Sequence, residues 1–498
     1  MRFYDVKIKN SVIAGVKTFF REPFNMSAHR LPQRVLCLVL VAVLFVGTIF
    51  APVSAFAWGE FTLKDEKELG RKFNVYVRSH LPLVQDAEIV EYVEGIVKRL
   101  SRGTPPQLFP FTVSVIRHNA VNAFACPGGY IFVHTGLILA MDNESEVAGV
   151  IAHEMAHITQ RHIASRIENS QYISILSLLG ALAGAFLGGG GQGSAAMLAG
   201  SMAAGQAAML NYSRNDEREA DQVGMNYLTK AGYPPQGMVG AFQVLGRKQW
   251  LMGSDIPSYL STHPGLAERV KDMSVRVSRL PQAQQKLKDD NMRFLRVQAL
   301  IRARYGDIAP SVQAFTKQMN GPNRCIALMG MGILCSRQNR INDASGYFEQ
   351  ALACSSNDQL VVREAGRFHY TKGDRAKGAK LLDRAVAMNA NDSFALFYRA
   401  KSLDEAGRVA EAIQYAKSVL KQVPEDSEVH DLLARLYGKN NNMFYANLHM
   451  AYSALYDNNK KRTKQFMDRA EPLCRTNEEK FAFERFTTIY KEREEFWK

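Results

Sequence analysis

Residues 150–158 contain His153, Glu154 and His157 in the pattern H-E-x-x-H. Residues four positions apart lie on one face of an α-helix, so the two imidazoles can bind the same metal ion. The carboxylate beside them can accept a proton from water. Burial of these polar groups without a partner would cost several kcal/mol, which a metal ion offsets. The pattern therefore predicts a zinc site in which Glu154 is the general base.

The flanking residues indicate that this motif lies on a helix inside a core. Most of them are apolar, and neither Pro nor Gly occurs from Val150 to Glu168. Asn143 and Glu146 have the spacing of an N-terminal capping box. We therefore expect one continuous helix through this stretch. The alternative, a surface helix with incidental histidines, does not fit the apolar flanks.

Two histidines are too few for a stable zinc site, so a third ligand is needed. On a continuous helix His162 faces away from the motif, which suits a supporting or surface role better. A stronger candidate is the acidic segment downstream, where Glu217 and Asp221 share one helix face and Glu219 lies about half a turn away. One carboxylate can ligate zinc while the other orients a ligating imidazole. The alternative is the solvated first turn of an ordinary helix.

Two strands are predicted before the motif, at residues 111–116 and 130–134, with a Pro-Gly-Gly turn ahead of the second. We expect a short hairpin. An exposed strand edge there could hold an extended substrate backbone beside the metal. The candidate edge residues are Asn122, Ala123 and Phe124. The alternative is a hairpin with a purely structural role.

The chain has 498 residues, of which 47% are hydrophobic, and a net charge of +14. This length allows two or three domains. Residues 1–57 carry seven Lys/Arg and two Asp/Glu, so they contribute five of the positive charges. The remaining excess is dispersed, and no motif indicates nucleic-acid binding, so a solvated basic surface is expected.

Residues 35–51 form an uncharged apolar run that follows Arg30 and Arg34 and precedes an Ala-x-Ala pattern ending at Ala57. This arrangement is typical of a secretory signal peptide, here residues 1–57, with Met26 as an alternative start. A retained membrane anchor is the alternative, but the run is short for a span. Export would place the chain in an oxidising compartment, where disulfides are allowed.

Five cysteines follow the predicted leader, so at least one thiol has no intramolecular partner. They are Cys126, Cys325, Cys335, Cys354 and Cys474. Cys335 and Cys354 fall in adjacent predicted helices and are a candidate pair, although spacing alone leaves the connectivity open.

After a Gln- and Lys-rich linker at residues 281–290, small residues recur every 34 positions. One register contains Ala344, Gly378, Ala412 and Ala446. This period predicts tetratricopeptide repeats over residues 291–498, which stack into a solenoid with a concave binding surface. An irregular helical bundle is the alternative. The catalytic domain would then span residues 58–280.

Residues 173–210 contain no charged side chain and have a Gly-rich centre. Neither half is long enough to span a membrane comfortably. The segment could be a mobile cover over the active-site cleft, a peripheral membrane contact, or two packed helices. We favour a packed but mobile cover.

The combined motifs resemble those of the M48 zinc metallopeptidases, gluzincins that include the CAAX prenyl protease and a bacterial heat-shock membrane protease. The matching segments are H-E-M-A-H at 153–157, S-R-x-x-E-x-x-A-D-x-x-G at 213–224, N-A-F-A-C-P-G-G at 122–129 and T-H-P at 262–264. The likeness is greatest to a secreted branch of the family with a tetratricopeptide tail. It implies an α+β, mostly helical zincin domain followed by an all-α solenoid.

The resemblance also implies a role for individual residues. His153, His157 and Glu217 would hold one zinc ion per chain, with Glu154 as the catalytic base. Asp221 would support a ligand without binding zinc itself. His263 would be an extra zinc ligand that displaces the catalytic water in a resting state.

The expected function is that of a periplasmic zinc endopeptidase that cleaves misfolded or stalled envelope proteins, in outer-membrane protein quality control and assembly. The repeats would bind these substrates or the outer-membrane assembly machinery, and no nucleic-acid partner is expected. The alternative is a chaperone or assembly scaffold with a largely latent metal site. Glu154→Gln would abolish the role of a protease and leave that of a scaffold.

Overall fold

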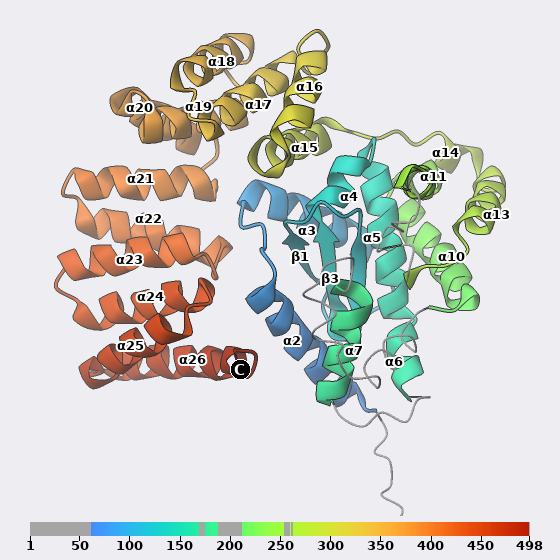
Figure 1. The fold of residues 1–498 in the computed structure, drawn as a ribbon, viewed down its shortest axis with the longest axis horizontal. Coiled ribbons are helices and arrows are strands. Elements are labelled where there is room, and N and C mark those ends of the chain that lie inside the picture. The colour runs from blue at the N-terminus through green and yellow to red at the C-terminus, as the bar shows by residue number, and fades with distance from the viewer. Residues whose placement is uncertain (1–60, 169–174, 188–211, 253–258, 260–261, 498) are drawn as a thin grey trace, which may run out of the picture. The chain divides into compact units, whose positions relative to one another are not determined.

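The computed structural model describes residues 61–497, apart from residues 169–174, 188–211, 253–258 and 260–261 (Figure 1). The predicted signal peptide lies outside the described residues, and so does the second half of the apolar segment 173–210.

Helices make up most of the described chain. The first two are α2 (Leu63–His80) and α3 (Ala87–Ser101). Their N-termini are capped by the side chains of Thr62 and Asp86, which satisfy backbone N–H groups that have no partner inside the helix. The other helices of the catalytic half are α4 (Thr135–Ala140), α5 (Glu144–Thr159), α6 (His162–Glu168), α7 (Ile175–Leu187), α10 (Arg214–Lys230), α11 (Gln236–Met252), α13 (Leu266–Ser278) and α14 (Gln282–Gln285).

A three-stranded sheet of β1 (Thr112–Ile116), β2 (Ala123–Cys126) and β3 (Tyr130–His134) has the order β1-β3-β2. β2 and β3 form the antiparallel hairpin, whereas β1 pairs with β3 in parallel. The predicted hairpin of the first and last strands is therefore wrong. β2 contains Ala123 and Phe124, two of the three candidate edge residues. Its pairing with β3 was not predicted, because all four of its residues are buried and show no alternation of polar and apolar side chains.

The helix that carries the metal motif is α5. All its residues from Ser145 to His157 are buried, and it packs against α10, α11 and β2. It ends at Thr159, and Arg161 adopts a left-handed conformation with φ of 53° before α6 begins. The predicted continuous helix to Glu168 is thus wrong. The strain at Arg161 is offset by ion pairs of its guanidinium with Glu66 and Glu168, each 2.8 Å long.

The C-terminal half is a stack of helix pairs (Figure 1), as the 34-residue period predicts. Small residues allow the paired helices to approach closely, because a Cβ atom at Gly378 would lie 2.2 Å from the backbone N of Tyr370. The helices are α15 (Met292–Tyr305), α16 (Ile308–Gln318), α17 (Arg324–Arg337), α18 (Ile341–Cys354), α19 (Gln359–Lys372), α20 (Arg375–Met388), α21 (Ser393–Glu405), α22 (Val409–Gln422), α23 (Ser427–Lys439), α24 (Met443–Tyr456), α25 (Lys460–Ala470) and α26 (Asn477–Glu494).

The catalytic half and the first repeats share one hydrophobic core, which extends from Val84 to Phe368. Gln298 of α15 donates hydrogen bonds to the carbonyls of Ile138 and Met141. Within the segment predicted as a linker, Asp289 accepts hydrogen bonds from the backbone and the hydroxyl of Ser145. The first repeats are therefore packed against the catalytic half.

One disulfide joins Cys325 to Cys354, with their Cα atoms 5.4 Å apart. The candidate pairing of Cys335 with Cys354 is wrong. α17 and α18 are antiparallel neighbours, so the end of α18 lies beside the start of α17. Cys335 lies ten residues beyond Cys325 on α17, about 15 Å along its axis, and its thiol is free and buried.

The described part of segment 173–210, α7, packs against α2. Leu178 and Leu182 are buried in the same core as Phe73. No described helix combines the length and apolarity needed to cross a membrane.

Candidate metal centre

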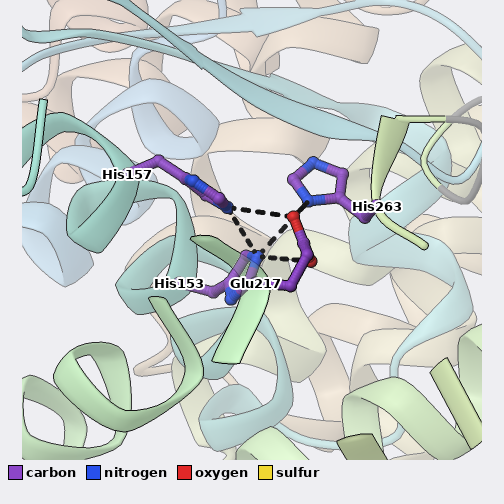
Figure 2. Close-up of side chains that lie close together, drawn as sticks. All are labelled: His153, His157, Glu217 and His263. Carbon is purple, nitrogen blue, oxygen red and sulfur yellow. Dashed lines mark hydrogen bonds and ion pairs between the residues drawn. The ribbon is translucent and has the colours of Figure 1, made fainter. Parts of the chain in front are cut away.

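Three segments bring four potential metal ligands together (Figure 2). α5 supplies His153 and His157, α10 supplies Glu217 from its first turn, and the segment before α13 supplies His263. One ligand atom from each lies within 4.8 Å of every other, and all four residues are buried. The start of α10 is fixed by a capping box between Ser213 and its third helical residue, which sets the direction of the Glu217 side chain.

The spacing of these atoms suits a small cation. Nε2 of His153 lies 3.0 Å from Nε2 of His157, 3.3 Å from Nδ1 of His263 and 3.5 Å from Oε2 of Glu217. Nε2 of His157 lies 3.4 Å from Oε1 of Glu217. Ligands about 2.0–2.1 Å from a tetrahedral zinc ion are roughly 3.3 Å from one another. The donor set and its spacing therefore fit zinc.

Both histidines of the motif are oriented by a contact on the nitrogen that faces away from the centre. Nδ1 of His153 lies 3.0 Å from Oδ1 of Asp221, and Nδ1 of His157 lies 2.8 Å from Nδ1 of His162. These contacts leave Nε2 of each ring directed at the centre. The turn at Arg161 brings His162 back to this contact. The prediction that His162 faces away from the motif is wrong because it assumed a continuous helix, whereas the supporting role suggested for His162 agrees with the contact.

Sequence reasoning missed Arg269, on α13, which is buried between the two carboxylates of α10. Its guanidinium donates to both oxygens of Asp221, at 2.7 and 2.8 Å, and forms an ion pair with Glu217. It also lies over the ring of Phe242. The signal that could have found it is electrostatic: two carboxylates that share a buried helix face need a cation nearby.

Two tyrosines, also missed by sequence reasoning, form the walls beside the histidines. The ring of Tyr212 stacks on His157 with centroids 3.7 Å apart, and the ring of Tyr259 stacks on His263 at 4.2 Å. Both rings are buried. They hold the imidazoles in position and keep water from the outer faces of the rings.

The electrostatics of the centre favour a bound cation. Burial opposes the charged form of His153, yet the carboxylates of Asp221 and Glu217 raise its pKa to about 9. Burial alone would also raise the pKa of Glu217, but the charges of His263 and Arg269 hold it well below its usual range. The carboxylates that favour a proton on His153 would favour a metal ion in the same position, so a metal can replace that proton.

Glu154 is fully buried and differs from the other carboxylates. Neither of its oxygens has a hydrogen-bond partner among the described residues, and Nε2 of His263 lies 3.6 Å from Oε1. Burial raises its pKa. The carboxylate therefore has free acceptor sites beside the centre, as a proton acceptor requires.

The candidate substrate-edge residues lie at the start of β2, which is an edge of the described sheet. The backbone of Asn122 accepts a hydrogen bond from His134. The alternation of an antiparallel ladder then directs the backbone groups of Ala123 and Ala125 away from β3. The side chain of Phe124 points into the core with Phe73 and Phe132. The side chains of β2 are therefore not available to a substrate, and its outward-facing backbone is covered as well, since Ala123 and Ala125 are no more than 1% exposed.

Glu219, the third carboxylate of the acidic segment, lies away from the centre. Its side chain is 54% exposed and reaches only Nε2 of His162, at 3.4 Å.

Comparison with known proteins agrees with this geometry. Residues 84–277 match peptidase family M48, and residues 369–436 match tetratricopeptide repeats. The chain carries an M48 peptidase domain. This domain contains both helices of the candidate metal centre, together with His263 and Arg269, and M48 proteins are metallopeptidases. The resemblance seen in the sequence is thereby confirmed, as is the predicted fold class.

Some relatives match well beyond the length of the M48 domain, and others over a shorter stretch. The beta-barrel assembly-enhancing protease of Escherichia coli K12 is 26% identical over 418 residues, which cover 81% of this chain and 85% of the relative. The protein of the same name from Yersinia pestis is 24% identical and covers 76% and 78%, respectively. The mitochondrial metalloendopeptidase OMA1 of Arabidopsis thaliana is 36% identical over 169 residues, or 32% of this chain and 30% of the relative. The solved tetratricopeptide protein YrrB aligns with 34% of this chain at a TM-score of 0.28, too low to compare architectures.

Proposed function

We propose that this protein is a zinc-dependent endopeptidase of the periplasm that cleaves misfolded or stalled envelope proteins and contributes to the assembly of outer-membrane proteins. The observation that carries the proposal is the buried convergence of His153, His157, Glu217 and His263 beside a carboxylate with free acceptor sites. The names of the relatives support the link to β-barrel assembly. The apolar run before Ala57 supports export.

In this proposal His153, His157 and Glu217 hold zinc, and Asp221 and Arg269 keep the ligands in place. A zinc ion in such a site makes water acidic and polarises a peptide carbonyl. Glu154 takes the proton from the attacking water and then donates it to the leaving amine. Its raised pKa suits both steps, because the carboxyl group must bind the proton and release it near neutral pH.

An extended substrate would lie along the outer edge of β2, with its backbone bonded to Ala123 and Ala125, once it displaces the residues that cover this edge. Strand addition of this kind recognises the main chain and places few demands on side chains. It suits an enzyme that acts on unfolded chains of varied sequence. The solenoid would bind the substrates or the outer-membrane assembly machinery, while segment 173–210 could contribute a cover or a peripheral membrane contact.

His263 would regulate the site. As an additional zinc ligand it would occupy the position that the catalytic water needs. The resting enzyme would then be slow until substrate or a partner moves the segment that carries His263.

The proposal is tested by Glu154→Gln in the mature chain, with Glu219→Gln as the matched control. We expect Glu154→Gln to abolish cleavage of an unfolded polypeptide while zinc, measured by metal analysis, stays bound. Glu219→Gln should cleave normally, since its carboxylate is exposed. The same variants then report on the cellular role: if outer-membrane assembly is fully restored by Glu154→Gln, the protein acts as a chaperone or scaffold and proteolysis is not its function.

A further inference from the structure

A cavity of about 670 Å³ lies between the catalytic half and the solenoid. Its solenoid wall comes mainly from the first helices of successive pairs, α17, α19, α21 and α23, and its other wall from the segment before α3 and the residue after β1. Aromatic rings line the part near α19 and α21; they are Phe368, Phe394, Phe397 and Tyr398. We call this space the repeat cavity.

Three cations gather around Tyr305 at the α17 side of the repeat cavity. The guanidinium of Arg117 lies over the Tyr305 ring, 5.9 Å from its centroid. Arg337 donates to the carbonyls of Ala303 and Gly306 on either side of it. Nζ of Lys372 donates to the carbonyl of Ser336, next to Arg337.

None of these three cations forms an ion pair with a carboxylate in the described part of the chain. Other cations of the cavity are neutralised: Arg304 pairs with Asp86 and Glu364. At the far side, on α23, Glu428 adds a negative charge. The charge of the repeat cavity therefore changes along its length. One side has positive charges without carboxylate partners, the middle is aromatic, and the other side is acidic.

Tyr305 and these three cations line one side of the repeat cavity. An acidic side chain within a peptide brings backbone on both sides of it, which the cavity must also hold. The carboxylate of a chain terminus brings backbone on one side only, because no residue follows it. Guanidinium and ammonium groups bind carboxylates through short, charge-assisted hydrogen bonds, and aromatic rings pack well against one another.

We propose that the repeat cavity binds the C-terminal end of an unfolded polypeptide, with the α-carboxylate against Arg117, Arg337 and Lys372 and a terminal aromatic side chain against Phe394 and Phe397. This inference deepens the proposed function, on which it rests only in taking the ligand to be a protein chain. A single terminus per chain gives each substrate one defined point of attachment, whatever its internal sequence.

The test uses the full mature chain carrying Glu154→Gln, so that the probe is not cleaved. The probe is a fluorescein-labelled heptapeptide, Ala-Gly-Ser-Gly-Ala-Tyr-Phe, with either a free or an amidated C-terminus, and binding is followed by fluorescence anisotropy. We expect the free acid to bind about tenfold or more tightly than the amide, since only the acid makes charged hydrogen bonds. Replacement of the last two residues by Ala should weaken binding of both forms.

The double variant Arg117→Gln/Lys372→Gln should lose most of the preference for the acid and keep only the part that Arg337 contributes, with binding of the amide unchanged. Both side chains are exposed, and their removal leaves the Arg337 helix contacts intact. The control, Arg102→Gln/Arg435→Gln, removes two exposed cations outside the cavity and should retain the preference for the acid. Arg337 itself is left unchanged because its hydrogen bonds hold the end of α15.

Equal affinity for acid and amide in the parent protein would overturn the proposal. So would an amidated peptide with Glu in the penultimate position that binds as tightly as the free acid, because the cavity would then recognise an acidic side chain. Failure of the endopeptidase function appears separately, as lack of cleavage by the protein with Glu154 intact, and does not change these binding measurements.

Discussion

The protein buries two clusters of charged side chains, and they differ in what they leave unpaired. In the metal cluster, around His153 and Glu217, the buried carboxylate of Glu154 has no hydrogen-bond partner among the described residues. In the repeat cluster, around Arg363, the carboxylates of Glu364 and Asp392 both have guanidinium partners. Arg363 lies 2.9 Å from Asp392 and 3.0 Å from Glu364, which also accepts from Arg304 at 2.6 Å.

The two clusters also differ in the pKa of their carboxyl groups. Burial would raise the pKa of Glu364, but the three arginines around it lower it to about 2. Burial raises the pKa of Glu154, and the nearby histidines do not reverse this. Buried carboxylates whose oxygens all have guanidinium or hydrogen-bond partners are part of the architecture, whereas a buried carboxylate without a hydrogen-bond partner beside converging imidazoles indicates a ligand.

The largest effect is expected for a substitution of Glu217, which disrupts the metal cluster. Glu217→Gln removes the anionic ligand, so zinc occupancy and peptidase activity should both fall to background. Glu219→Gln, two residues along the same helix, should leave both unchanged because that side chain is exposed. Metal analysis of the two purified variants and a peptide-cleavage assay decide the matter. Full zinc occupancy in Glu217→Gln would remove Glu217 from the ligand set.

The corresponding change in the repeat cluster should affect stability alone. Arg363→Met leaves the carboxylates of Glu364 and Asp392 buried with less compensation, which costs about 3–5 kcal/mol of unfolding free energy. Below the unfolding transition, zinc content should not change. Arg435→Met, at an exposed ion pair, should change the free energy by no more than about 0.5 kcal/mol. Denaturant unfolding of both variants provides the measurement, and loss of zinc from folded Arg363→Met would show that the two clusters are not independent.

The difference between the clusters also explains what could be predicted from the sequence. The potential ligands on α5 follow from one local motif, because helical periodicity alone places His153 and His157 together. Glu217 and Asp221 were found as a pair for the same reason. Arg269 was missed, since its contact with them depends on how α13 packs and not on any local spacing.

The remaining failures have the same origin. The break before His162 depends on an ion pair of Arg161 with Glu66, almost a hundred residues earlier in the chain. The parallel pairing of β1 with β3 and the Cys325–Cys354 disulfide depend on which elements become neighbours. Repeats were predictable because each pair of helices contacts chiefly the next, so a local period determines much of the packing.

A third prediction concerns two buried histidines of the solenoid, His430 and His449, which belong to no potential metal-ligand group among the described residues. Nδ1 of His430 lies 2.9 Å from Nδ1 of His449, and its Nε2 lies 3.0 Å from the carbonyl of Pro424. Burial lowers the pKa of His430 to about 4 and that of His449 well below its usual value. Glu425, which favours protonation of His430, and Lys417, which opposes that of His449, are the charged groups that act on the pair.

Because the folded pKa lies below the unfolded value of about 6.5, the unfolded chain binds the proton more readily. The contribution of His430 to stability is therefore complete above pH 6.5 and is lost as the pH falls towards 4. We expect a loss of up to about 3 kcal/mol. Denaturant unfolding at pH 7 and pH 4.5 should show a smaller pH dependence in His430→Gln than in the parent. The control is His80→Gln, a substitution of an exposed histidine. If His430→Gln has the same pH dependence of stability as the parent, His430 is not a source of that dependence.

The smallest effect is expected at His263. It distinguishes a regulatory from a catalytic role of this residue in the metal cluster. Its Nδ1 lies 2.9 Å from Oε1 of Glu217, and Tyr259 stacks on its other side. If His263 occupies the position needed by water, His263→Ala should raise cleavage of a short unstructured peptide about tenfold, since a larger fraction of the enzyme is then competent. Zinc should remain, because three ligands suffice in catalytic sites. His118→Ala, at an exposed histidine, should have no effect.

Lower activity with zinc retained would mean that His263 acts in the transition state, and loss of zinc would mean that it is a structural ligand. In either case the fourth position would not be a latch, and the slow resting state would require another cause.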